Sequence, residues 1–62
     1  NASSKRDFRN KIFICKKEAS ETKHWLRMIA RANNQQRDTC KILWKEANEL
    51  TMIFSKIVLS AK

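Results

Sequence analysis

Residues 26–43 read LRMIARANNQQRDTCKIL, and the chain divides at the polar, uncharged run of residues 33–36 within them. Apolar residues recur at helical spacing on both sides of this run, which indicates two helices joined there. We expect Asn33 or Asn34 to take the left-handed conformation that closes a helix lacking glycine. Asp38 follows at a position where its charge favours the start of a second helix. These signals predict one helix over about 4–32, a turn over about 33–36 and a second helix over about 37–61.

The composition favours the same all-α fold class. The chain has 62 residues without glycine or proline, although 42% of its residues are hydrophobic. The loops that cradle phosphates or dinucleotides need glycine, and strands need turn residues between them. Ser4, followed three residues later by Asp7, is typical of a helix start. The sequence therefore predicts long helices and excludes nucleotide-binding sites built on glycine-rich loops.

Apolar residues repeat every 3.5 residues in both predicted helices, which is typical of helices packed at a shallow angle. In the first helix the repeat comprises Phe8, Ile12, Cys15, Ala19, Thr22, Leu26 and Ile29. In the second it comprises Cys40, Leu43, Ala47, Leu50, Phe54, Ile57 and Ala61. Folding the chain at the turn brings the two series into register over their whole length. The prediction is an antiparallel helical hairpin with these residues at its seam.

Ten large apolar residues remain outside this seam. Six of them form the predicted oligomer interface: Ile14, Trp25, Met28, Trp44, Ile53 and Val58. This much exposed apolar surface is not typical of a soluble monomer. We therefore expect an up-and-down four-helix bundle, completed by self-association into at least a dimer or by helices that this sequence lacks. The alternative is a two-helix peptide with a few apolar surface residues.

Few residues suggest catalysis or metal binding. Glu21 and His24 have the Glu-x-x-His spacing of di-iron bundles, but the repeat places both away from the seam. Cys15 and Cys40 lack the CxxC framework of a zinc site, and we expect both to be reduced and buried. They lie about 20 Å apart along the predicted hairpin, too far for a disulfide within the chain. We expect no catalytic residue, no metal, no cofactor and no small-molecule substrate.

The chain is strongly basic, because 14 Lys and Arg residues and only 6 Asp and Glu residues give it a net charge of +8. Most of the excess lies along one flank of the first helix, where acidic residues are few. We predict that this basic strip binds RNA or DNA phosphates without sequence specificity, chiefly through counterion release. Its residues are Arg6, Arg9, Lys16, Lys17, Lys23, Arg27 and Arg31. Trp25 and Trp44 could stack on bases, but we interpret both as core or interface anchors.

Three alternatives to nucleic-acid binding stay open. The basic strip can be a solvated face that keeps an apolar oligomer soluble, or a surface for anionic lipid. The chain can also be a purely structural oligomerisation or protein-interaction module. No apolar run approaches the roughly 20 residues of a membrane helix, and no signal peptide is found. We therefore expect a cytoplasmic protein that does not insert into membranes.

Several short motifs are shared with a known family. They are Ser3-Ser4-Lys5-Arg6-Asp7-Phe8, Lys17-Glu18-Ala19, Glu21-Thr22, Trp25-Leu26, Glu46-Ala47-Asn48-Glu49-Leu50 and Ser60-Ala61-Lys62. Together they resemble the four-helix bundle proteins encoded in intervening sequences of bacterial 23S ribosomal RNA genes, over that family's third and fourth helices. The resemblance implies a bundle that associates further, without established catalytic activity. The chain departs from the family at Arg9 and Lys16, where members have aliphatic residues, and at His24, where they have an aromatic one.

Overall fold

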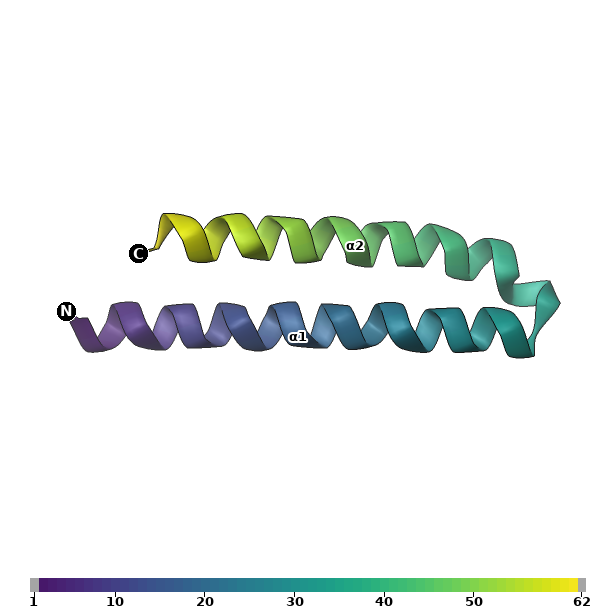
Figure 1. The fold of residues 1–62 in the computed structure, drawn as a ribbon, viewed down its shortest axis with the longest axis horizontal. Coiled ribbons are helices and arrows are strands. Elements are labelled where there is room, and N and C mark those ends of the chain that lie inside the picture. Colours follow the sequence, from purple (N-terminus) through teal and green to yellow (C-terminus); the bar gives the residue numbers. More distant parts are fainter. Residues whose placement is uncertain (1, 62) are drawn as a thin grey trace.

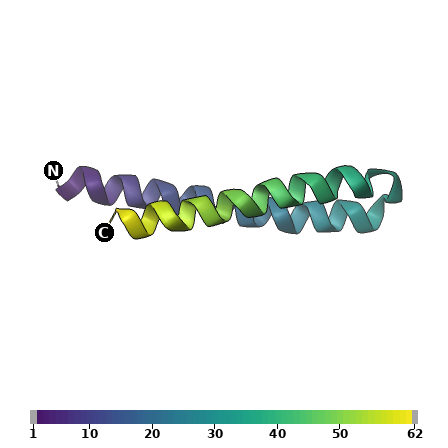
Figure 2. The same ribbon diagram turned by 90° about the horizontal axis from the view of Figure 1, so that it is seen from above.

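The computed structural model describes residues 2–61, and the side chains of residues 4–61. Two long antiparallel helices, joined by one 3-10 turn, make up the described chain (Figure 1). Their bounds are α1 Ala2–Ala32, η1 Asn34–Gln36 and α2 Arg37–Ser60. The Cα atoms extend 49 × 14 × 10 Å, and Figure 2 shows the two rods crossing at a shallow angle. The structure confirms the predicted all-α helical hairpin.

The helix ends differ slightly from the predicted ones. α1 begins at Ala2, so Ser4 and Asp7 lie within the helix instead of capping it. Asp7 forms an ion pair with Lys11 one turn later, with an O–N distance of 3.1 Å. α2 ends at Ser60, and the N–H group of Ala61 donates to the carbonyl oxygen of Ile57 at 3.0 Å.

The turn reverses the chain without a left-handed residue. Asn33 is extended, with φ −142° and ψ 99°, and its side-chain oxygen accepts a hydrogen bond from the Gln35 N–H at 3.0 Å. Asn34 belongs to η1, and none of the described residues has a positive φ. The predicted left-handed cap is therefore wrong. An extended Asn33 followed by a 3-10 turn achieves the reversal without the steric cost that a Cβ atom pays in the left-handed region.

The seam between the helices also differs from the predicted one. In α1 the least exposed residues are Arg9, Ile12, Lys16, Ala19, Lys23, Leu26 and Ala30. In α2 the corresponding series is Cys40, Trp44, Ala47, Thr51, Phe54, Val58 and Ala61, with Asn48, Ser55 and Ile57 half-buried beside it. The 3.5-residue spacing is preserved. However, every second residue of the predicted seam is replaced by the residue that follows it in the sequence. Each helix is therefore rotated relative to its predicted orientation.

The residues most buried in the observed seam are small, and three of the four also belong to the predicted seam. The buried side chains are Ala19, Cys40, Ala47 and Thr51, all of them small. The Thr51 hydroxyl is satisfied locally, because it donates to the Asn48 carbonyl oxygen at 2.7 Å. Half-buried Arg9, Lys16 and Lys23 lay their aliphatic stems along the seam, as long basic side chains commonly do. The resulting core is narrow and contains no fully buried large side chain among the described residues.

Several large apolar residues of the predicted seam lie to one side of the observed one, although Ile12, Leu26 and Phe54 stay in it. Phe8 and Ile29 in α1 are 48% and 47% exposed, and Leu43 and Leu50 in α2 are 43% and 45% exposed. In both helices these residues come one position before a residue of the seam. Because the helices are antiparallel and face each other, equivalent flanks lie on the same side of the hairpin. We call this surface the apolar face; its residues are Phe8, Cys15, Thr22, Ile29, Leu43, Leu50 and Ile57.

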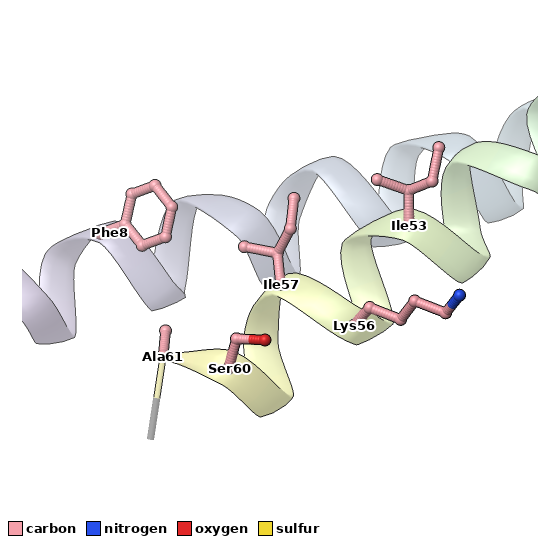
Figure 3. A pocket seen from close by; sticks show the side chains of 6 residues that line it. All are labelled: Phe8, Ile53, Lys56, Ile57, Ser60 and Ala61. Atoms are coloured by element: carbon pink, nitrogen blue, oxygen red, sulfur yellow. The ribbon is translucent and has the colours of Figure 1, made fainter.

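At the open end of the hairpin, the apolar face visibly spans both helices. Phe8 of α1 and Ile53 and Ile57 of α2 line an open hollow of about 350 Å³, together with Ser60 and Ala61 (Figure 3). Lys56 lies at the rim of this hollow. Over the residues described, neither α1 nor α2 has an apolar stretch long enough to cross a membrane.

Candidate nucleic-acid interface

The structure divides the predicted basic strip into two groups. Arg9, Lys16 and Lys23 are half-buried in the seam between the helices. The exposed members are Arg6, Lys17, Arg27 and Arg31. Only four of the seven residues of the predicted basic strip are therefore fully exposed. The rotation of α1 that removes Phe8, Cys15 and Thr22 from the seam brings the residue after each of them into it.

Lys23 is engaged within the hairpin. Its Nζ atom donates a hydrogen bond to Asn48 Oδ1 of α2 at 3.0 Å. The same atom lies 5.3 Å from the centroid of the Trp44 ring, within the range of a cation–π interaction. Lys23 thus connects the two helices, and its charge is only partly available to an external phosphate.

Arg27 is held by the same tryptophan but stays exposed. Its guanidinium carbon lies 5.2 Å from the centroid of the Trp44 ring. Trp44 is half-buried, and its indole N–H is buried with no hydrogen-bond partner among the described residues. A stacked guanidinium presents its flat face to the ring and keeps the N–H groups on its edge for other acceptors. Trp44 therefore orients Arg27 without neutralising its charge.

Basic residues of both helices lie around Trp44 and toward the turn. We call this set the turn-end basic cluster; its members are Lys23, Arg27 and Arg31 of α1, and Arg37, Lys41 and Lys45 of α2. They line three adjoining hollows of about 410, 490 and 200 Å³, all of which include Arg27. None of the described residues lining these hollows is acidic. The arrangement concentrates positive charge on one side of the hairpin near the turn.

Sequence reasoning missed the α2 half of this cluster. The second helix has little net charge, because Asp38, Glu46 and Glu49 offset three of its basic residues. The spacing of these residues could have indicated their role. Arg37, Lys41 and Lys45 follow one another at four-residue intervals and therefore share a flank of the helix. Only the fold places that flank beside Arg27.

The predicted oligomer-interface residues fall into an exposed group and a half-buried group. Ile14, Trp25, Met28 and Ile53 are exposed large apolar residues, with Trp25 exposed by 58%. Trp44 and Val58 are half-buried in the seam, so their predicted position outside it is wrong. The rotation of α2 brings them inward in place of Leu43 and Ile57.

The cysteines and the Glu-x-x-His pair have no metal-site geometry. Cys40 is buried and Cys15 is exposed, both as free thiols, so the expected burial of Cys15 is wrong. Glu21 is exposed, and the His24 ring packs edge-on against Trp25 with centroids 5.3 Å apart. Within the described part of the chain, no three His, Cys, Asp or Glu residues lie close enough to hold a metal ion.

Comparisons with family models, with curated proteins and with solved structures found no match to this chain. The resemblance to the ribosomal intervening-sequence proteins stays a prediction made from the sequence motifs.

Proposed function

We propose that this chain is a non-catalytic helical hairpin that self-associates into a four-helix bundle and binds RNA or DNA phosphates without sequence specificity. The observation that carries the nucleic-acid proposal is the turn-end basic cluster, in which both helices contribute cations around Trp44. A net charge of +8 adds long-range attraction for a polyanion. The interface differs from the strip predicted on α1 alone, because Arg37, Lys41 and Lys45 join it and the seam residues contribute less.

The surroundings of Trp44 favour contact with the phosphate backbone over contact with bases. A tryptophan that binds bases needs a free ring face. Here the ring is half-buried, and both Lys23 and Arg27 lie over it. Arg27, Arg31 and Lys41 are exposed and can each contact a phosphate oxygen. Phosphate contacts position a protein on nucleic acid but do not read its sequence.

Salt dependence tests the nucleic-acid proposal. If about four phosphates are neutralised, the affinity for a generic RNA duplex is expected to fall about 100-fold between 50 and 200 mM salt. Fluorescence anisotropy with a labelled duplex measures this slope. An affinity that is immeasurable at low salt, or that does not respond to salt, contradicts the proposal.

A pair of matched variants locates the interface. Replacing Lys41 and Lys45 with Gln removes two charges from the cluster, and replacing Lys5 and Lys56 with Gln removes two exposed charges elsewhere. We expect about a tenfold loss of affinity for the first variant and a much smaller loss for the second. Equal losses would show that net charge alone, and not the cluster, determines binding.

A second candidate function is purely structural oligomerisation, and the apolar face favours it. In an isolated pair of helices the apolar stripe is centred on the contact. In a four-helix bundle the stripe points to the bundle axis, between a helix and its neighbours. The stripes of α1 and α2 are displaced from the seam toward the same side, as a bundle requires. A second copy of the chain offers the same stripe and can cover it.

Cys15 reports on this association, because it is an exposed thiol on the apolar face. If two copies pack through this face, its alkylation should slow as the protein concentration rises. An unchanged rate at concentrations where sedimentation shows an oligomer would place the contact elsewhere. Association without any binding of nucleic acid would leave the structural function as the better account.

A further inference from the structure

We propose that the hollow between Arg27, Arg31 and Arg37 is a binding site for the terminal phosphate monoester of a nucleic-acid strand. The proposal rests on the nucleic-acid function proposed above and names the part of the ligand that this end of the hairpin recognises. The hollow measures about 490 Å³, and Ala30 and Asn34 complete its lining.

Three arginines from two helices line this hollow. Arg27 and Arg31 lie four residues apart in the last two turns of α1, and therefore on one face of that helix. Arg37 is the first residue of α2, at the positive end of that helix dipole. Ala30, with only a methyl side chain, leaves the space between the arginines open. The site is thus formed only when the chain folds back at the turn.

Arg27 is positioned before any ligand arrives. The contact between its guanidinium group and the Trp44 ring, at 5.2 Å, restricts a side chain that would otherwise sample many rotamers. Arg27 lines all three hollows of the turn-end basic cluster. We therefore expect a ligand that binds Arg27 to change the environment of Trp44, which provides a fluorescence signal.

The charge of the hollow favours a monoester over the diesters within a strand. A phosphate monoester carries between about −1.5 and −2 charges at neutral pH and has three terminal oxygens. A phosphodiester carries one negative charge and two such oxygens. Arginine donates from a planar fork that pairs with phosphate oxygens in a bidentate manner. Three arginines around one hollow repel one another, and a dianion relieves more of that repulsion than a monoanion does.

The experiment compares two oligonucleotides of identical sequence, one with a 5′-phosphate and one with a 5′-hydroxyl group. The protein carries Trp25→Phe, so that fluorescence reports on Trp44 alone. We expect the phosphorylated strand to bind about tenfold more tightly, because it adds charge-assisted hydrogen bonds. Equal affinities of the two strands would overturn the proposal.

Two further variants show whether the preference comes from this hollow. In Arg31→Gln with Arg37→Gln, we expect both strands to bind with the same affinity. In Lys41→Gln with Lys45→Gln, we expect both affinities to fall while their ratio is kept. A preference that survives the arginine variant would overturn the assignment to the hollow. Circular dichroism checks that each variant keeps its helices.

The design separates this inference from the proposed function. Binding of the 5′-hydroxyl strand tests the function, and the ratio between the strands tests the hollow. If neither strand binds, the proposed function fails, and a titration with inorganic phosphate then tests the hollow alone. A saturable change in Trp44 fluorescence that the arginine variant abolishes would support it. The absence of any change would overturn it.

Discussion

Trp44 shows how one side chain can serve both the fold and the candidate interface. It is half-buried between the helices, where its ring contacts Lys23 and Arg27 from α1. Its indole N–H is buried without a partner among the described residues, which costs free energy. The ring therefore stabilises the hairpin through the apolar area that it buries and through its contacts with the two cations. The indole N–H group does not contribute a hydrogen bond within the hairpin.

Substitutions of Trp44 should separate these contributions. Trp44→Phe keeps an aromatic face and removes the unpaired N–H, so we expect the free energy of unfolding to change by less than about 1 kcal/mol. Trp44→Ala removes the ring and leaves a cavity, with an expected loss of about 3 kcal/mol. Urea unfolding followed by circular dichroism measures both variants at one protein concentration. A loss for Trp44→Phe as large as that for Trp44→Ala would mean that the indole N–H does find a partner.

At the scale of elements, the turn was predicted at the right place with the wrong conformation. The polar run of residues 33–36 interrupts the apolar repeat, so its position follows directly from local sequence. Asparagine is favoured both in the left-handed region and as a capping residue, and the sequence does not discriminate between these roles. The extended backbone of Asn33 and its hydrogen bond to the Gln35 N–H identify the capping role.

Asn33→Gly tests this assignment. Glycine would stabilise a left-handed position, because it lacks the Cβ atom that is disfavoured there. At an extended capping position it removes the side-chain acceptor and loosens the unfolded chain, so we expect a loss of about 1 kcal/mol. Thermal unfolding, compared with Asn34→Gly as the neighbouring control, measures the effect. A stabilised Asn33→Gly variant would contradict the observed turn geometry.

For the whole molecule, the two flanks of the hairpin have opposite chemistry near the turn, whereas Phe13, Met52 and Leu59 add exposed apolar residues to the basic flank farther from it. The apolar face leaves Leu43 and Leu50 nearly half exposed, and the turn-end basic cluster lies on the other flank. Because the two surfaces are separate, self-association through one leaves the other open to a polyanion. A bundle of two copies would present two basic clusters, and a nucleic acid that reaches both would bind more tightly than to a single hairpin.

A pair of charged substitutions tests the association. Leu50→Glu places a charge on the apolar face and should prevent self-association, because burying an unpaired carboxylate costs several kcal/mol. Ile42 is 60% exposed and lies one residue before Leu43, farther from the seam, so Ile42→Glu should leave the oligomer intact. Sedimentation velocity at several concentrations distinguishes the outcomes. An oligomer that persists in Leu50→Glu would show that another surface mediates the contact.

The fold gives a common location to two positions at which the chain departs from the family that it resembles. Arg9 and Lys16, at which the chain differs from the resembled family, are both half-buried in the seam. Aliphatic residues at these positions would suit that location, which the apolar repeat of this chain alone does not reveal. The contributions of Arg37, Lys41 and Lys45 were missed for a related reason. Their shared flank is evident from four-residue spacing, but its partner on α1 is not.

The sequence by itself determined two helices, the point at which they join and their antiparallel pairing. These features follow from the lack of glycine and proline and from a 3.5-residue apolar repeat, which act through local backbone preferences and helix periodicity. Only the tertiary structure decided how each helix is rotated about its axis. A rotation of about 50° exchanges Cys15 for Lys16 and Leu50 for Thr51 while keeping Ala19 and Ala47 at the contact. Both orientations satisfy the same repeat and share these small residues, so the repeat alone does not decide between them. The packing of one helix against the other fixes the rotation, and with it the positions of the basic cluster and the apolar face.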